Sequence, residues 1–80
     1  MNYTTDLKYN QMLNKLPKDT ELHPMDPDFI DPEYLSDDYN YILFEYTIDN
    51  FSETINSLKS NNIEYKVLKD SFNLNYILIK

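Results

Sequence analysis

Five amino-acid types are missing from the 80-residue chain: cysteine, glycine, tryptophan, arginine and alanine. Without cysteine there is no disulfide, no thiolate metal ligand and no thiol nucleophile. Without glycine there is no Gly-rich phosphate loop and no dinucleotide-binding fingerprint. The only histidine is His23, which excludes a metal site with two histidines. These absences remove the common signatures of enzymes, so we expect neither a cofactor, nor a metal, nor catalysis.

Long hydrophobic runs are also missing. No stretch of 18 apolar residues could cross a membrane, and residues 1–6 lack the apolar core of a signal peptide. We therefore expect a cytoplasmic protein. With 80 residues, 41% of them hydrophobic, the chain is too apolar for full disorder and has the length of a single domain, residues 1–80, with a small core.

Acidic residues outnumber basic ones, and they are unevenly distributed along the chain. The chain carries 14 acids and 7 lysines, for a formal net charge of -7. Residues 1–40 hold nine of those acids and three lysines, a net charge of -6, whereas residues 41–80 have a net charge of -1. Residues 19–38 contain eight acids and no basic residue other than His23. The first half of the chain therefore carries most of the negative field.

Residues 1–16 are predicted to contain an N-terminal helix running from Asp6 to Leu16. Tyr9, Met12, Leu13 and Leu16 recur at steps of three and four residues, which is the spacing of one helical face. The proline at position 17 cannot continue the helix. Such a short helix is marginal in water, so its apolar face is expected to dock on the rest of the domain.

Residues 17–40 are predicted to form an acidic, Pro-rich connector. Its prolines lack N–H donors and exclude a long regular element. The run Asp31-Pro32-Glu33 predicts a short helical turn over about 32–37, with Asp31 as N-cap and proline at the first helical position. Its apolar residues are expected to anchor the connector on the domain: Phe29, Ile30, Tyr34 and Leu35.

Residues 41–80 are predicted to form a βαββ core. Residues 41–48 alternate as a strand, and a helix follows from Asn50, which has Glu53 at capping-box spacing. The pair Asn61-Asn62 is expected to end that helix, because asparagine tolerates left-handed geometry. Residues 63–67 and 74–79 read as two further strands joined by a turn at 69–71.

The simplest assembly of these elements is an α+β fold. It has a three-stranded sheet in the order 1-3-2, joined by a right-handed crossover, with both helices on one face. The apolar run 76–79 suits a central strand buried on both sides. The alternative order keeps the first two strands adjacent and parallel and puts the last strand at the edge.

The connector carboxylates allow four interpretations. A calcium loop is suggested by the spacing of Asp26, Asp28, Asp31 and Glu33, but prolines interrupt it and no glycine makes its sharp turn. A carboxylate pair for acid–base chemistry lacks any partner residue. A solvated loop that adds solubility is the plainest interpretation. The fourth is an anionic surface that attracts a basic partner and repels nucleic acid.

Aromatic residues interleaved with the acids favour the anionic surface. A merely solvating tract is poor in aromatics, and aromatic side chains are frequent in the energetically important centre of protein interfaces. We therefore predict a partner-binding set of six acids and two tyrosines: Asp26, Asp28, Asp31, Glu33, Tyr34, Asp37, Asp38 and Tyr39.

In size and charge the chain is similar to two classes of small inhibitor. One comprises phage-encoded DNA mimics, which block nucleic-acid-binding host proteins such as the nucleases of antiviral defence, with anti-CRISPR proteins among them. The other comprises immunity proteins and antitoxins that cover a basic toxin. The likeness implies a non-enzymatic inhibitor that occupies the basic, nucleic-acid-binding surface of a partner protein and works in the host cytoplasm if phage-encoded.

The alternative function is a small regulatory or immunity-type α/β interaction module without nucleic-acid mimicry. Under either function we expect no direct binding to nucleic acid or membrane. A three-stranded sheet also leaves two open edges, and covering one of them predicts a homodimer in the absence of the partner.

Overall fold

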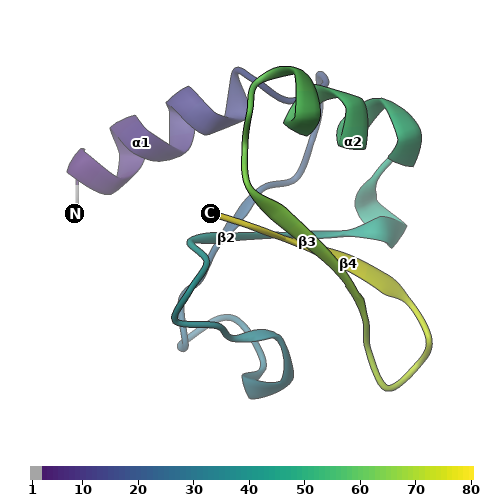
Figure 1. Ribbon diagram of the computed structural model, residues 1–80. Helices are drawn as coiled ribbons and strands as arrows, with labels where there is room; N and C mark the ends of the chain where they lie inside the picture. Colours follow the sequence, from purple (N-terminus) through teal and green to yellow (C-terminus); the bar gives the residue numbers. More distant parts are fainter. Residues whose placement is uncertain (1–2) are drawn as a thin grey trace.

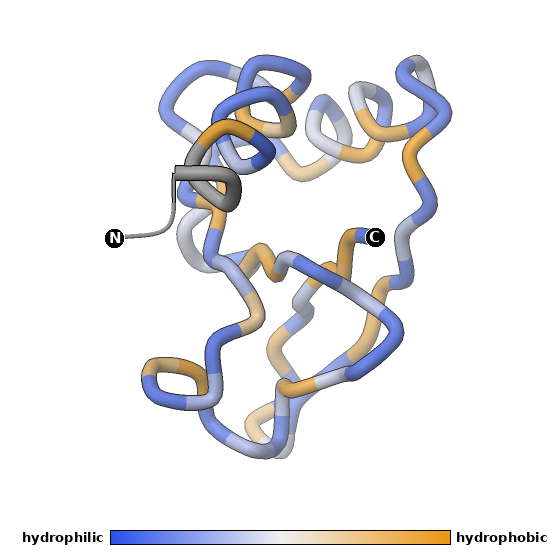
Figure 2. Tube along the Cα trace, turned by 90° about the vertical axis from the view of Figure 1, so that its left-hand side faces the viewer, coloured by the Kyte–Doolittle hydropathy of each residue, from blue (hydrophilic) through white to orange (hydrophobic). Residues whose placement is uncertain are grey.

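The computed structural model describes residues 3–80, and side chains are described from Leu7 onward. Within this range the fold is α+β, as expected, with helices α1 (Tyr3–Leu13) and α2 (Phe51–Ser60) packed on one face of an antiparallel sheet. Figure 1 shows both helices on one side of the strands and the segment that precedes β2 on the other. The chain is thus arranged in three layers, which the rotated view in Figure 2 also shows.

The sheet contains four strands across residues 3–80, which corrects the expected three. They are β1 (His23–Pro24), β2 (Tyr41–Phe44), β3 (Tyr65–Lys69) and β4 (Asn75–Ile79), in the order β1-β2-β4-β3. The three expected strands lie in the order β2-β4-β3, so the last strand is central and the alternative order is wrong. The added strand β1 comes from the predicted connector, where His23 pairs with Ile42. Pro24 fits there because an edge strand tolerates a missing N–H.

Strand β2 is shorter than the alternation from 41 to 48 suggested. It ends at Phe44 and continues as a 3₁₀ turn, η2 (Glu45–Thr47), in which the Thr47 hydroxyl donates to the Phe44 carbonyl at 2.8 Å. This turn changes the face of the following residues: Phe44 packs on the connector side and Ile48 on the helix side. Alternation of a strand over residues 41–48 would place Phe44 and Ile48 on the same face, and the structure corrects this.

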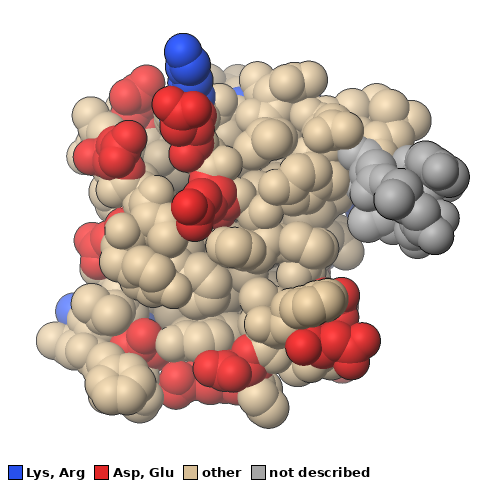
Figure 3. Space-filling view, turned by 180° about the vertical axis from the view of Figure 1, so that it is seen from behind, with Lys and Arg blue, Asp and Glu red and all other residues tan. Residues whose placement is uncertain are grey.

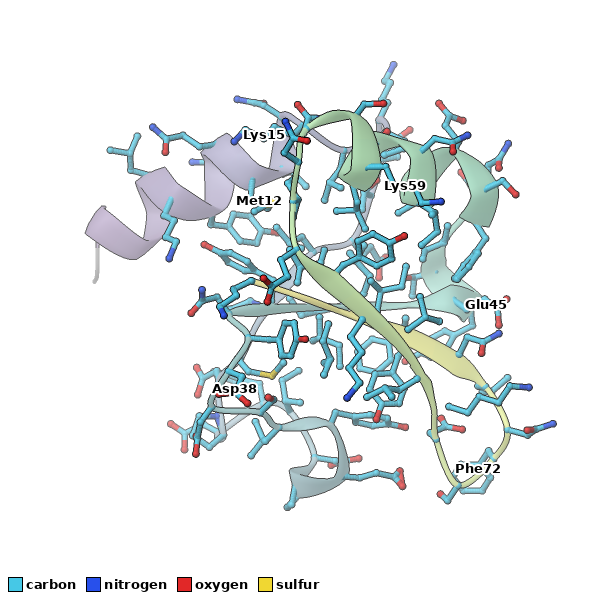
Figure 4. The ribbon with its side chains drawn as sticks, in the orientation of Figure 1. Met12, Lys15, Asp38, Glu45, Lys59 and Phe72 are labelled. Carbon is cyan, nitrogen blue, oxygen red and sulfur yellow. The ribbon has the colours of Figure 1, made fainter. Side chains whose placement is uncertain are left out.

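Helix α1 begins and ends three residues earlier than predicted. After Leu13 the chain tightens, with the Lys15 and Leu16 amides donating to the carbonyls of Met12 and Leu13. Leu16 nevertheless remains buried under the helices, as the helical periodicity required. Figure 4 shows Met12 on α1, the helix whose partly buried face packs on this core.

Helix α2 begins and ends where the sequence predicted. The Asn50 side chain accepts a hydrogen bond from the Glu53 amide at 3.0 Å, so the predicted N-cap is confirmed. At the other end Asn62 has φ of 56°, the left-handed geometry expected there. Asp19 and Asn73 also have positive φ, so this glycine-free chain uses Asp and Asn at its three described left-handed positions.

The sheet is buried on both faces. On the helix face seven side chains are buried: Leu16, Leu22, Tyr41, Leu43, Leu58, Ile77 and Ile79. On the opposite face, which we call the connector face, four are buried: Ile30, Ile42, Tyr76 and Leu78. Alternate residues of β2 and β4 serve the two cores, as pleated strands dictate. The two-sided burial predicted for residues 76–79 is confirmed.

Candidate anionic interface

The eight predicted partner-binding residues all belong to the segment that covers the connector face. This segment, residues 25–39, is held by side chains of the connector-face core: Met25, Ile30, Tyr34, Leu35 and Tyr39. Its only regular element is the 3₁₀ turn η1 (Pro32–Tyr34), shorter than the predicted turn over 32–37. These five side chains pack on the sheet, which leaves most of the acids on the outer side.

The six acids differ in how far they are used inside the fold. Asp28, Asp31, Glu33, Asp37 and Asp38 are exposed, and Asp26 is half-buried. Asp26 has a local structural role, because its Oδ1 accepts a hydrogen bond from the Asp28 amide at 2.9 Å. Asp31 precedes η1, but its side chain makes no capping hydrogen bond, so the predicted side-chain cap is wrong. Its carboxylate is therefore available to a ligand.

Basic side chains do not neutralise this surface in the described part of the chain. Among residues 7–80 an ion pair joins Glu64 to Lys80 at 3.4 Å, and the Glu21 carboxylate lies 4.0 Å from His23, which carries a charge only when it is protonated. Neither contact includes one of the six predicted acids. Figure 3 shows one group of acidic side chains along the lower part of the molecule and another at its upper left, with few basic side chains in view. The five exposed acids of residues 25–39 therefore lie on one folded segment without a described ion pair.

Tyr34 fixes the connector to the β3–β4 hairpin. Its ring lies edge-on to Phe44 and Tyr76, with centroids 5.1 and 5.0 Å away, and its hydroxyl donates to Asp70 Oδ2 at 2.8 Å. This hydrogen bond to a carboxylate, together with burial, raises the pKa of Tyr34 to about 12. The hydroxyl is thus engaged inside the fold, and only the ring remains for a partner.

Asp70 is the other end of this link. Its Oδ1 accepts from the amides of Phe72 and Leu74, both at 2.9 Å, which stabilises the hairpin turn. The Leu74 amide is the main cause of a lowered Asp70 pKa, and the Tyr34 hydroxyl adds to it. The carboxylate is therefore held ionised by its own loop, in the position that Tyr34 needs.

Tyr39 lies at the other end of the segment. It is half-buried and lines a hollow of about 420 Å³ together with Asp37, Ser36 and Lys8. The neighbouring Asp38 amide donates to the Ser36 hydroxyl at 3.2 Å. Figure 4 places Asp38 on the connector, and its side chain is exposed. The predicted residues therefore spread along the connector face, without gathering into one pocket.

Sequence reasoning misplaced one aromatic residue and overlooked another. Phe29 was expected to anchor the connector, but 84% of its surface is exposed. Tyr46, expected inside a strand, is 69% exposed because η2 turns it outward. The direction of the Phe29 side chain depends on the local turn, in which its amide donates to the Asp26 carbonyl.

The described residues show no group of three or more His, Asp or Glu side chains able to hold a metal ion, so nothing there supports a calcium loop. Between residues 3 and 80 there is also no helix with the length and apolar character needed to cross a membrane. Comparison of the chain with protein-family models, with curated proteins and with solved structures gave no match.

Proposed function

We propose that the protein is a non-enzymatic inhibitor that binds a basic, nucleic-acid-binding surface of a partner protein through its connector. Its six carboxylates, Asp26, Asp28, Asp31, Glu33, Asp37 and Asp38, take the place of phosphates, and Tyr34 and Tyr39 add ring contacts. The partner class is a nuclease or another nucleic-acid-binding protein. In this role the protein is a DNA or RNA mimic of the kind that phages use as anti-defence or anti-CRISPR proteins, acting in the host cytoplasm.

One observation carries the proposal. A segment without long regular structure is nevertheless fixed on the sheet by buried Ile30 and by the Tyr34–Asp70 hydrogen bond, and five of its carboxylates are exposed. A solvated loop needs no such anchoring. Holding charges on a folded support lowers the entropy lost when a partner binds them, and a one-sign field speeds the encounter with a basic surface.

The alternative is a regulatory or immunity-type module that binds through the sheet edge. Strand β3 is an outer strand, and its Val67 is 40% exposed. The proposed homodimer would also use β3, because β1, at the opposite edge, has two residues. Lys66 and Lys69 on β3 are exposed and place like charges at that edge, which weakens self-pairing. This feature favours the connector as the interface.

The test compares two variants with the same change in charge. The connector variant carries D28N, D31N, E33Q, D37N and D38N and retains Asp26, which supports the local turn. The control variant carries five other substitutions at exposed acids, all outside residues 25–39: D19N, E21Q, D49N, E53Q and E64Q. Each variant therefore loses five negative charges from the same formal net charge of -7.

Each protein is titrated into a panel of nucleases with basic nucleic-acid clefts, CRISPR-associated nucleases included, and cleavage and association rates are measured. We expect the parent and the control to inhibit one nuclease in a salt-sensitive way. The connector variant should associate on the order of tenfold or more slowly, and saturating the nuclease with DNA should weaken binding of the parent. Equal inhibition by the parent and the connector variant contradicts the proposal and favours the β3 edge.

A further inference from the structure

A groove lined by aromatic rings lies at the margin of the connector face. It has a volume of about 340 Å³, and its lining includes His23, Phe29, Asp31, Tyr34, Phe44 and Tyr46. Three parts of the chain meet there: strand β1, the connector, and the β2–η2 junction. We call this feature the aromatic groove. Its size is near the lower end of the range of about 300–1,000 Å³ for ligand sites.

The rings of the aromatic groove are arranged around Phe44. Tyr46 stacks on Phe44 with centroids 5.5 Å apart and planes 28° apart, while His23 and Tyr34 approach it at 5.7 and 5.1 Å. Phe44 is half-buried and belongs to the connector-face core. The groove therefore has a base fixed by packing, whereas Phe29 and Tyr46 remain mostly exposed to solvent. Their ring surface is available to a ligand.

The charge around the aromatic groove has one sign. Asp31 is part of its lining, and Asp28 and Glu33, both exposed, lie close by in sequence. The described lining contains no lysine. Aromatic faces attract cations through the negative potential above the ring, and a nearby carboxylate adds to that attraction. An anion or a phosphate is disfavoured at the same place by the overall charge of -7.

We propose that the aromatic groove receives an arginine side chain of the partner's basic surface. This inference rests on the proposed function and specifies which side chain the connector recognises. A planar guanidinium can stack on the exposed rings of Phe29 or Tyr46 while it donates to the Asp31 carboxylate. A lysine ammonium makes neither the stacked contact nor a two-pronged hydrogen bond, and it is more strongly hydrated.

The test uses the tripeptides Ac-Gly-Arg-Gly-NH₂ and Ac-Gly-Lys-Gly-NH₂, titrated into the full chain and followed by NMR chemical shifts. We expect the arginine peptide to shift the signals of Phe29, Tyr46 and Asp31 and to bind more tightly than the lysine peptide. The double variant F29A/Y46A should lose about fivefold or more in affinity for the arginine peptide. Equal binding of the two peptides would overturn the assignment to arginine.

Two control variants test whether binding of the arginine peptide depends on the ring faces in the groove. One removes an exposed ring elsewhere, and the other replaces both groove rings by apolar side chains. F72A removes an aromatic residue that is 80% exposed but does not line the groove, so it should bind the arginine peptide like the parent. Figure 4 places Phe72 at the tip of the β3–β4 hairpin. F29L/Y46L keeps apolar surface without aromatic faces and should lose affinity as F29A/Y46A does. Unchanged affinity in F29L/Y46L would contradict recognition by the rings.

The nuclease panel distinguishes failure of this inference from failure of the proposed function. If the connector variant loses inhibition while F29A/Y46A inhibits like the parent, the groove assignment is wrong and the proposed function stands. If F29A/Y46A loses arginine-peptide binding while the connector variant inhibits like the parent, the groove binds arginine but the mimicry is wrong. Both positions are exposed, and an unchanged amide NMR spectrum away from the groove checks that the variants fold.

Discussion

The helix face and the connector face of one sheet are covered in different ways. Two helices cover the first face, over a core of seven buried side chains. A Pro-interrupted segment covers the second, over a core of four, and it is fixed by single side chains such as Ile30 and Tyr34. The comparison shows that an irregular, highly acidic segment can be part of the folded core on its inner side while its outer side carries charge.

The largest expected effect is a loss of stability when the two most buried residues of β2 are truncated, and this loss tests the comparison of the two faces. Leu43 and Ile42 are both 0% exposed, one on each face. Each substitution to alanine should cost about 2–5 kcal/mol of unfolding free energy. Leu43→Ala should cost more, because two regular helices collapse into a cavity less readily than the connector does. Urea denaturation measures both losses.

A milder pair controls for outright unfolding of this small domain: Ile42→Val and Leu43→Val. The conservative change at Ile42 should cost about 0.5–1.5 kcal/mol. A loss near zero for Ile42→Ala would mean that the connector does not pack on the sheet in solution.

A smaller effect is expected from Tyr34→Phe, which cuts the link between the connector and the hairpin but keeps the ring. Because the pKa of Tyr34 rises from its usual 10.0 to about 12 in the fold, the neutral hydroxyl stabilises the folded state fully below about pH 10. This contribution is lost as the pH rises toward 12. The variant should be less stable than the parent at neutral pH, and the difference should shrink in alkali.

Urea midpoints of the parent and of Tyr34→Phe, measured from pH 7 to pH 12, give that difference. Part of the loss of stability at high pH should remain in Tyr34→Phe, since burial also raises the pKa of Tyr41 and Tyr76. The lowered pKa of Asp70 has the opposite effect on the pH dependence of stability. The ionised carboxylate stabilises the folded state above its usual pKa of 3.8, and this contribution is lost as the pH falls through the lower pKa of the folded state. A difference independent of pH would contradict the Tyr34–Asp70 bond.

The smallest effect concerns the outer side of the connector. Its exposed acids repel one another without a lysine in an ion pair, so the connector variant should be slightly more stable than the parent at low salt. Each substitution should change the unfolding free energy by no more than about 0.5 kcal/mol. Adding salt should raise the stability of the parent more than that of the variant, because screening weakens repulsion between surface charges. A large loss of stability in the variant would show that these acids support the fold.

Local signals in the sequence were sufficient for several elements. The cap formed by Asn50 and the left-handed Asn62 fixed both ends of α2, because a cap depends on neighbours within a few residues. The continuous apolar run predicted the two-sided burial of residues 76–79. The acids at 28, 31, 33, 37 and 38 were expected on the surface, and charge alone makes burial there costly.

Other features depended on contacts between distant residues or on particular local turns. A two-residue strand such as β1 has no pattern of its own, and it forms only because Ile42 presents a free edge to His23. The turn after Phe44 overrides a good strand pattern, and the outward direction of Phe29 and Tyr46 follows from local turns that hydrophobicity does not encode. The aromatic groove could not be predicted, since its rings come from three separate segments.

The sequence by itself determined the excess of acids in the first half, the absence of glycine and cysteine, and the helix and strands with clear periodicity. Those properties follow from residue types and spacing over a few positions. The sequence also indicated that the acidic connector is anchored on the domain, but only the tertiary structure decided which face of the sheet it covers and which of its aromatics are buried. The reason is that burial on the connector face depends on the match between Ile30 and Tyr34 and a surface formed by β2 and β4, whose residues follow much later in the chain.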